Sequence, residues 1–303
     1  MSAQDLLPVA TTMGTLTLKV GDLASMSAYY AAALGLAVLE DGTDAVVLGR
    51  QGSAVLRLEE ARHLRLPNRG EAGLFHTALL FPDRADLAAA VASAARHPRS
   101  AYVGSADHLV SEAFYFSDPE GNGIELYFDR PRETWAWTED GQGNREVTMG
   151  SLPLPPRDYI GQHLTEAAAS SAESRSATVG HVHLQVGDVE TAHRFYVDVL
   201  GFERTAGWHD QALFVSAGGY HHHMAMNVWN SRGAGPRRDT LGLGEVLIRV
   251  PAADEVAALA DRLAHAGIAN HHTGAELRFE DPWRNRLRVA VDAPSAGVRP
   301  RPS

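Results

Sequence analysis

The chain repeats a block of its own sequence at a constant offset. The two copies are residues 14–36, GTLTLKVGDLASMSAYYAAALGL, and residues 180–202, GHVHLQVGDVETAHRFYVDVLGF. Each copy opens with alternating residues, typical of a strand with one buried face, and then turns at Gly-Asp into a helical spacing of apolar residues. A Leu-Gly pair is expected to end the helix in each copy, because glycine accepts the left-handed conformation that commonly terminates a helix. Both copies are therefore expected to build the same supersecondary unit.

The downstream halves of the two copies also correspond, although less closely. GLFHTALLF at residues 73–81 matches GLGEVLIRV at residues 242–250, and each precedes a helical pattern. SDPEGNGIELYF at residues 117–128 matches EDPWRNRLRVAV at residues 280–291. Further strand patterns lie between these matching segments in each copy. The sequence therefore predicts an α+β chain of four βαβββ units.

These units divide into two tandem modules with a segment of different composition between them. We expect the first module over residues 11–130 and the second over residues 177–293. Residues 131–176 include LPLPPRD and EAAASSAESRSA and are rich in Pro, Gly, Ser and charge. Such a composition indicates a linker, with room for a short helix.

Charge and residue usage exclude several classes of function. The 303 residues contain 27 Lys and Arg against 37 Asp and Glu, a formal net charge of −10, and no cysteine. An acidic chain is not expected to bind nucleic acid or an anionic membrane. A chain without cysteine has no disulfide and no thiolate metal site. No apolar run approaches the roughly 20 residues of a membrane helix, and the N-terminus lacks a signal-peptide pattern. We expect a cytoplasmic protein that acts on small molecules, with homo-oligomerisation left open.

Several of these segments carry a family resemblance. The opening HVHLQVGD at residues 181–188, the closing DPEGNGIELYF at residues 118–128 and the four βαβββ units resemble the vicinal oxygen chelate superfamily. That superfamily includes glyoxalase I, extradiol dioxygenases and bleomycin-binding proteins, and its paired units curl eight strands around a cup that holds a divalent metal. GGYHHHMAMNVW at residues 218–229 and the segment 107–135 further resemble bacterial two-module catechol 2,3-dioxygenases. The resemblance implies curved eight-stranded cups.

The resemblance also implies an extradiol ring-cleaving dioxygenase, which opens a catechol-type ring with O2 at a mononuclear metal. The family's ligands are a His on the opening strand of one unit, plus a His and a closing-strand Glu from a second unit. These positions hold His181 in unit three and His76 and Glu125 in unit two. Two His and one carboxylate form the facial triad of non-haem Fe(II) oxygenases, and Mn(II) suits the same ligands. His183 faces the same side of its strand as His181 and is an alternative ligand.

The other pairing of units offers no such ligand set. The corresponding positions hold Thr15 in unit one, and Glu245 and Arg288 in unit four. We expect a salt bridge between Glu245 and Arg288 in place of a metal ion. A metal site therefore requires that unit two pairs with unit three, across the two modules, as also occurs in glyoxalase I.

Three successive histidines, His221–His223, lie on a predicted strand. Because side chains alternate along a strand, His222 and His223 are expected to face opposite sides. Matched without gaps to the extradiol family, His222 takes the position of the acid–base catalyst. Matched to the glyoxalase strand, His223 takes the position of a second carboxylate ligand. We expect His222 to be catalytic, with His223 as the alternative and as a candidate substrate-binding residue.

Two further residues are candidates to contact the substrate. Tyr115, in AFYFSDPEG, stands where extradiol enzymes place a Tyr that hydrogen-bonds the substrate hydroxyl, so the resemblance implies a catalytic role. His108 lies earlier in the same segment, which borders the cup in relatives, and is a candidate substrate-binding residue. Trp135 and Trp137, in ETWAWTEDG, are candidates to cover the cup.

Two other functions stay open on the sequence. A glyoxalase-type lyase or isomerase would use Ni(II), Co(II) or Zn(II), and a fourth ligand at His223 would favour it. A metal-free binding or resistance protein, like the bleomycin-binding members, would dispense with the ligands. The three ligand types at family positions favour an enzyme that uses Fe(II), a small aromatic diol and O2.

Overall fold

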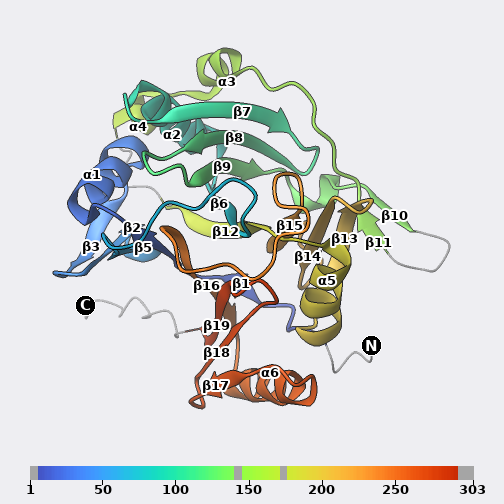
Figure 1. Cartoon of the computed structure of the whole chain (residues 1–303). Helices are drawn as coiled ribbons and strands as arrows, with labels where there is room; N and C mark the ends of the chain where they lie inside the picture. Colours follow the sequence, from blue (N-terminus) through green and yellow to red (C-terminus); the bar gives the residue numbers. More distant parts are fainter. Residues whose placement is uncertain (1–5, 140–144, 171–175, 293–303) are drawn as a thin grey trace, which may run out of the picture.

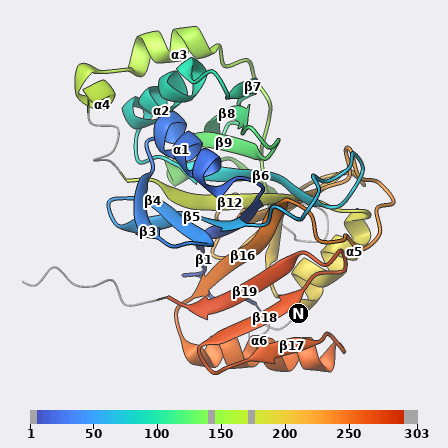
Figure 2. The same cartoon turned by 60° about the vertical axis from the view of Figure 1, so that its left-hand side comes forward.

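Two curved β-sheets, built from four copies of one unit, make up most of the computed structural model (Figures 1 and 2). The structure describes residues 6–139, 145–170 and 176–292. Unit one consists of β2 (Leu16–Val20), α1 (Leu23–Leu34), β3 (Ala37–Asp41), β4 (Ala45–Arg50) and β5 (Ser53–Glu60). Unit two consists of β6 (Gly73–Leu80), α2 (Arg84–Arg96), β7 (Ala101–Asp107), β8 (Ser111–Ser117) and β9 (Gly123–Asp129).

The second half of the chain follows the same order of elements. Unit three consists of β12 (Thr178–Gln185), α5 (Val189–His193), the π-helical turn η4 (Arg194–Val199), β13 (Glu203–Trp208), β14 (Ala212–Ser216) and β15 (Met224–Asn227). Unit four consists of β16 (Gly242–Val250), α6 (Ala253–His265), β17 (Asn270–His272), β18 (Glu276–Glu280) and β19 (Arg286–Val291). The predicted βαβββ order is therefore present in every unit.

Each sheet combines one unit from either half of the chain. Sheet I has the strand order β13-β14-β15-β12-β6-β9-β8-β7, so units three and two form it, and β12 and β6 pair antiparallel at its centre. Sheet II has the order β17-β18-β19-β16-β2-β5-β4-β3, from units four and one, with β1 (Thr12–Met13) paired to β16. The predicted α+β class and curved eight-stranded sheets are confirmed.

The turn from each opening strand into its helix follows the sequence expectation. Asp22 caps α1 by accepting a hydrogen bond from Ser25 N at 3.0 Å, and Asp188 caps α5 by accepting one from Thr191 N at 2.7 Å. Such side chains satisfy amide groups that have no partner within the helix. Gly35 ends α1 with a φ of 63°, a left-handed conformation that a side chain disfavours.

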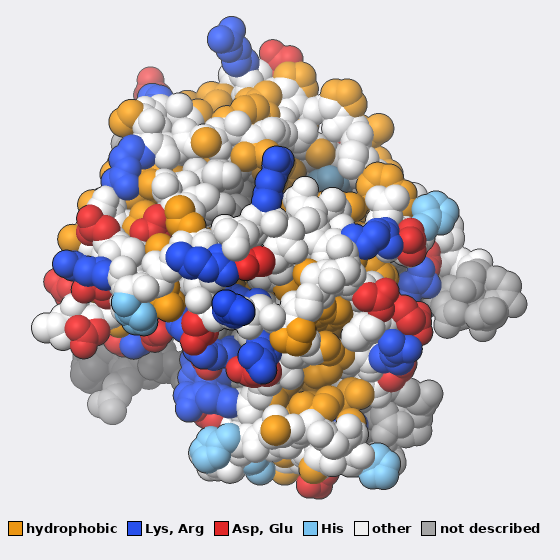
Figure 3. All heavy atoms as spheres, in the orientation of Figure 1, with side chains coloured by type: hydrophobic (Ala, Val, Ile, Leu, Met, Phe, Trp, Pro, Cys, Tyr) orange, Lys and Arg blue, Asp and Glu red, His pale blue; other side chains and the backbone are white. Residues whose placement is uncertain are grey.

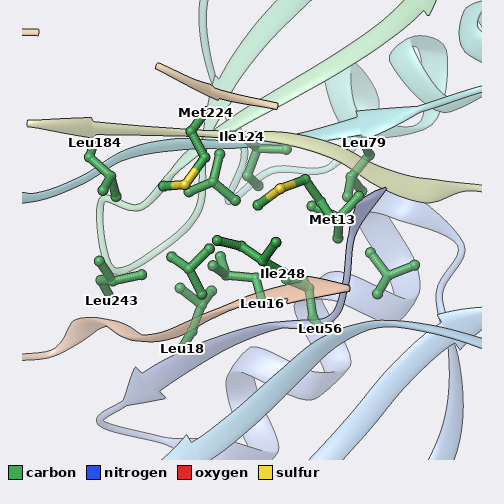
Figure 4. Close-up of a cluster of buried hydrophobic side chains, with 14 of the residues drawn as sticks. Met13, Leu16, Leu18, Leu56, Leu79, Ile124, Leu184, Met224, Leu243 and Ile248 are labelled. Atoms are coloured by element: carbon green, nitrogen blue, oxygen red, sulfur yellow. The ribbon is translucent and has the colours of Figure 1, made fainter. Parts of the chain in front are cut away.

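The main core lies between the two sheets, as Figure 4 shows. Leu184 and Met224 of sheet I lie opposite Leu18 and Leu243 of sheet II, and all four are buried. One continuous cluster of buried apolar side chains includes residues of all four units. Burial of this apolar surface stabilises both sheets together. Alternate residues of the same strands point to the other face of sheet I, which is left for the candidate site.

The segment between the two repeated halves carries structure of its own. It contains η2 (Arg132–Thr134), the hairpin strands β10 (Trp137–Glu139) and β11 (Arg145–Val147), and the helices α3 (Pro156–His163) and α4 (Glu166–Ser170). Figure 1 shows α3 and α4 beside α2 at the outer side of sheet I. Residues 140–144 and 171–175 of the expected linker, and residue 293 at the expected end of the second module, lie outside the described residues.

Charged side chains of both signs are mixed on the surface. On the face shown in Figure 3, Lys and Arg side chains lie beside Asp and Glu side chains. Exposed ion pairs include Lys19–Asp239 at 3.3 Å and Arg232–Asp210 at 3.0 Å. In the part of the chain that the structure describes, no helix is long and apolar enough to cross a membrane.

Candidate metal centre

Three side chains from units two and three meet on the face of sheet I that points away from the core. His76 lies on β6, Glu125 on the neighbouring β9 and His181 on β12. Glu125 Oε2 lies 2.8 Å from His76 Nε2 and 3.0 Å from His181 Nε2. One ligand atom of each residue lies within 4.8 Å of the others, and the described residues contain no second group of this kind. The cross-module pairing thus brings together the three predicted ligands.

The electrostatics of these side chains suit a bound cation. His76, Glu125 and His181 are all buried. Burial alone would raise the pKa of Glu125, but the neighbouring His181 and His76 hold this pKa well below its usual range, so the carboxylate is ionised. Burial lowers the pKa of His181, which favours the neutral imidazole that binds metals.

Two buried ring nitrogens of the candidate ligands, His76 Nε2 and His181 Nδ1, lack a hydrogen bond among the described residues. The contact between His76 Nε2 and Glu125 Oε2 does not have hydrogen-bond geometry, and Nε2 has no other partner among the described residues. Buried polar atoms are nearly always paired, so an unpaired nitrogen aimed at a carboxylate calls for a ligand. Two imidazole nitrogens and one carboxylate oxygen are a donor set for a divalent transition metal with open coordination positions. The residues present therefore fit a metal ion.

His183 lies beside the three candidate ligands but is held by another residue. Its ring centroid is 4.9 Å from that of His76, and Asn227 Nδ2 donates to His183 Nε2 at 2.9 Å. Burial, followed by the charge of His76, lowers the pKa of His183 well below its usual range. Because its Nε2 is already hydrogen-bonded, His183 fits the wall of the site better than a ligand position.

Two of the candidate ligands, His76 and Glu125, line a cavity of about 1200 Å³. Phe75, Phe214 and Trp229 give it apolar walls, while His76 and Glu125 form part of its polar surface. Pockets for drug-sized ligands typically measure about 300–1000 Å³. The cavity therefore has room for more than one aromatic ring.

Tyr115 and His108 line the same cavity and share a hydrogen bond. The Tyr115 hydroxyl lies 2.8 Å from His108 Nε2, and His108 Nδ1 lies 2.6 Å from Gly150 O. Because a carbonyl oxygen only accepts, His108 Nδ1 carries a hydrogen and donates to Gly150 O. The Tyr115 ring lies 5.5 Å from that of His76. Burial, followed by the charge of Glu125, raises the pKa of Tyr115 well above its usual range, so the phenol is neutral.

His221–His223 do not lie on a strand, contrary to the prediction. β15 begins at Met224, and the histidines follow a turn in which Gly218 and Gly219 have φ values of 64° and 67°. Without strand alternation neighbouring rings meet, and His221 Nδ1 lies 2.8 Å from His222 Nδ1. A run of identical residues has no periodicity that could separate a strand from a turn, which is why the prediction was wrong.

His222 and His223 occupy different places. His222 lines the cavity, and its ring centroid lies 4.1 Å from that of His181. Burial, followed by the charges of His181 and His221, lowers the pKa of His222 well below its usual range, so this imidazole is neutral. His223 is not among the described residues that line the cavity, and its Nδ1 accepts a hydrogen bond from Ala217 N at 3.2 Å. The structure thus brings His222, and not His223, to the candidate site.

Sequence reasoning missed the residues that hold this histidine run. Asp129, the last residue of β9, places Oδ1 at 2.8 Å from His221 Nε2. The Tyr220 hydroxyl donates to Asp129 Oδ2 at 2.8 Å, and the Tyr127 hydroxyl lies 2.7 Å from that of Tyr220. The only sequence signal was the adjacency of Asp129 to the closing strand, which by itself does not reveal a partner far along the chain.

The segment between the modules contributes to the cavity, but not through its tryptophans. Residues 146–151, in and after β11, line the cavity, whereas Trp135 and Trp137 do not. Trp135 instead packs against His221, with ring centroids 5.3 Å apart. Arg204 on β13 forms an ion pair of 2.6 Å with Glu146, which fixes this segment to sheet I.

The corresponding positions of sheet II hold ion pairs. Arg288 Nε lies 2.8 Å from Glu245 Oε1, which confirms the predicted salt bridge. Arg288 Nη1 also lies 2.9 Å from Glu276 Oε1, and Arg278 Nε lies 3.6 Å from Glu245 Oε2. Opposite charges at these distances compensate one another. Only sheet I therefore presents a ligand group among the described residues.

Comparison with known proteins places the chain in a family. The model of the Glyoxalase/Bleomycin resistance protein/Dioxygenase superfamily matches residues 12–126 and 178–289. The chain therefore belongs to this superfamily, as its sequence motifs predicted. It is 37% identical over 279 residues to the catechol-2,3-dioxygenase of Bacillus subtilis (strain 168), a match that covers 90% of this chain and 94% of that protein.

Solved structures share the fold at low sequence identity. A putative dioxygenase from Bacillus subtilis subsp. subtilis str. 168 matches with a TM-score of 0.61 and 15% identity over 93% of this chain and 86% of that chain. Glyoxalase I from Zea mays matches with a TM-score of 0.56 and 14% identity over 93% of this chain and 92% of that chain. These likenesses concern the fold alone.

Proposed function

We propose that the chain is an extradiol dioxygenase, which opens a catechol-type aromatic ring with O2 at a mononuclear Fe(II). His76, Glu125 and His181 hold the metal. The observation that carries the proposal is the buried group of two His and one Glu at the wall of a largely apolar cavity. This donor set leaves coordination positions open for substrate and O2. The 37% identity to a catechol-2,3-dioxygenase supports the same class of reaction.

The chain's own residues bind and orient the diol and move a proton. Fe(II), when bound, supplies the redox chemistry between the diol and O2. A catechol that binds a metal loses a proton, and His222 is a neutral base that lines the cavity. The Tyr115 hydroxyl lines the cavity at 2.8 Å from His108 Nε2 and hydrogen-bonds a hydroxyl of the substrate. His222 and Tyr115 thus define a binding position beside the ligands.

The cavity suits diols that carry apolar substituents. Its volume of about 1200 Å³ is larger than an unsubstituted catechol requires. Phe75 and Trp229 lie edge to face with ring centroids 5.3 Å apart and form an aromatic wall. Substituted catechols are therefore included among the proposed substrates.

Metal analysis followed by oxygen uptake tests the proposal. The chain is purified anaerobically, supplied with Fe(II) and mixed with catechol or an apolar-substituted catechol. About one iron per chain, with oxygen consumption and a yellow ring-cleavage product, is the expected result. Nickel or zinc without oxygen uptake would instead indicate a glyoxalase-type lyase or isomerase. Tight binding of small molecules without any metal would indicate a binding protein.

Ligand substitutions distinguish the two sheets in the same assay. Removal of a ligand in His76→Ala, Glu125→Ala or His181→Ala is expected to weaken iron binding by more than about tenfold. Arg288→Ala, at the corresponding position of sheet II, is the matched control and is expected to keep its iron. Full iron content in His181→Ala would reject the assignment and point to His183.

A further inference from the structure

A series of two hydrogen bonds leads from the half-buried Asp129 to the cavity. Asp129 Oδ1 lies 2.8 Å from His221 Nε2, and His221 Nδ1 lies 2.8 Å from His222 Nδ1. His221 is fully buried, and His222 lines the cavity. Nε2 of His222 has no hydrogen-bond partner among the described residues. This series of hydrogen bonds therefore ends at a single ring nitrogen, His222 Nε2, which is left for a ligand.

The direction of each hydrogen bond follows from the chemistry of its atoms. A carboxylate oxygen only accepts, so His221 Nε2 carries a hydrogen and donates to Asp129. A neutral His221 then has a lone pair at Nδ1. Because a hydrogen bond between two nitrogens needs one hydrogen, His222 Nδ1 supplies it. His222 Nε2 is consequently the unprotonated nitrogen.

We propose that Asp129 and His221 are positioning residues that hold His222 in its Nδ1–H tautomer, with the Nε2 lone pair available to a diol. The assignment rests on the proposed function in one respect only, namely that the diol is the proton donor. When the diol hydroxyl loses its proton, its O–H bond breaks and an N–H bond forms at His222 Nε2. The resulting imidazolium still donates to His221, which donates to the Asp129 carboxylate, so the carboxylate stabilises the new positive charge.

The surroundings of Asp129 fix the arrangement. The Tyr220 hydroxyl donates to Asp129 Oδ2 at 2.8 Å and accepts from the Tyr127 hydroxyl at 2.7 Å. The Tyr220 ring also packs on His221, with centroids 4.2 Å apart. Asp129 thus receives one donor at each oxygen, and both donors come from the segment that precedes His222. The carboxylate, rather than the backbone, sets the tautomer.

Nitrogen NMR of the full-length chain tests the tautomer directly. The protein is labelled with 15N-histidine and loaded with Zn(II), a diamagnetic probe, and His222 is assigned with the His222→Phe variant. The expected spectrum shows a protonated Nδ1 and an unprotonated Nε2 at His222. A protonated Nε2 in the wild-type chain would overturn the proposal. This measurement does not depend on turnover, so it remains informative if the dioxygenase assay fails.

An amide at position 129 is expected to reverse the tautomer. In Asp129→Asn the amide oxygen accepts from Tyr220, so the amide NH2 faces His221 Nε2 and forces the hydrogen onto His221 Nδ1. His222 then carries its hydrogen at Nε2 and cannot take a proton. We expect kcat to fall by about 10²–10⁴-fold with unchanged iron content.

Removal of the tyrosine hydroxyl provides a rescue. In the double variant Asp129→Asn/Tyr220→Phe the amide can turn its oxygen toward His221. The original tautomer of His222 is then expected to return, and kcat is expected to be at least about tenfold higher than in Asp129→Asn alone. Asp198→Asn is the matched control, because Asp198 faces His193 at 3.7 Å on the exposed surface. Wild-type kcat in Asp129→Asn, or no recovery of the His222 tautomer in the double variant, would refute the positioning role.

Discussion

Gly180 determines how closely side chains pack behind the candidate ligands. A Cβ at this position would overlap the Tyr127 hydroxyl, and Leu80 Cβ would lie 3.1 Å away. Gly180→Ala is therefore expected to displace Tyr127 from Tyr220 and to lower the free energy of unfolding by about 1–3 kcal/mol, as overpacking does. Urea unfolding measures the change. Gly161→Ala on α3 meets no atom within 4 Å and serves as the control, with stability unchanged or slightly raised.

The histidine run gives a second prediction for single residues. His222→Phe removes the only one of the three rings that lines the cavity, so iron binding is retained while kcat falls by about 10²–10⁴-fold. His223→Phe removes a buried acceptor of Ala217 N and is expected to cost about 1–3 kcal/mol of stability with a much smaller effect on kcat. Steady-state oxygen uptake and thermal unfolding separate the two effects. An inactive His223→Phe beside a nearly wild-type His222→Phe would show that His223, and not His222, transfers the proton.

The repeat helped to predict some residues of the site, but it gave no information about others. His76, Glu125 and His181 occupy fixed positions of the repeated unit, and the family resemblance identified these positions as those of the metal ligands. The contact between Asp129 and His221 depends on the path of the turn at residues 218–223, which no repeat encodes. Local sequence describes a strand register well, but it does not describe which distant side chain a turn will meet.

Among the elements, β12 aims two histidines at one site with the help of irregular pairing. Its register with β6 shifts between Val179 and His181 and again between His183 and Leu184. Such bulges increase the local twist and change the direction of side chains. They explain why the simple alternation used for the sequence is only approximate beside the ligands.

Helix α3 is fixed to sheet I by a buried carboxylate, which gives a prediction for this element. Glu112 on β8 accepts from Arg84 at 2.8 Å and from the Tyr159 hydroxyl of α3 at 3.1 Å. Burial would raise the pKa of Glu112, but Arg84 and its other partners hold this pKa below the ordinary 4.5. Glu112→Gln is expected to lower the free energy of unfolding at pH 7 by about 1.5–3 kcal/mol.

The sign of the pH dependence follows from the lowered pKa. A carboxyl whose pKa is lower in the folded chain stabilises it fully above its unfolded pKa, and this stabilisation is lost as the pH falls through the folded value. The difference in unfolding free energy between wild type and Glu112→Gln should therefore be largest near neutral pH and shrink below about pH 4.5. Glu190→Gln, in an exposed pair, is the control with little effect at any pH. A difference that grows on acidification would contradict the assigned role.

At the scale of the whole molecule, the distribution of ligand types predicted the pairing of units. Neither repeated half contains the full set, so a metal site required strands from both halves, and the structure pairs β6 with β12. The sequence offered no comparable signal for the segment between the halves, where β11 and the residues after it line the cavity. That segment has no counterpart in the repeat, so only the structure could place it.

The same shared architecture predicts that neither half is sufficient alone. A fragment of residues 1–130 carries His76 and Glu125 but lacks β12 and His181, and its buried apolar cluster loses the residues of units three and four. If two such fragments paired with each other, unit one would offer Thr15 at the position of His181, so the ligand set would still be incomplete. We expect no stoichiometric iron in this fragment, and about one iron per pair when it is co-expressed with residues 177–303. Metal analysis of the purified fragments measures both outcomes, and a fragment of residues 1–130 that binds a full equivalent of iron by itself would reject the shared site.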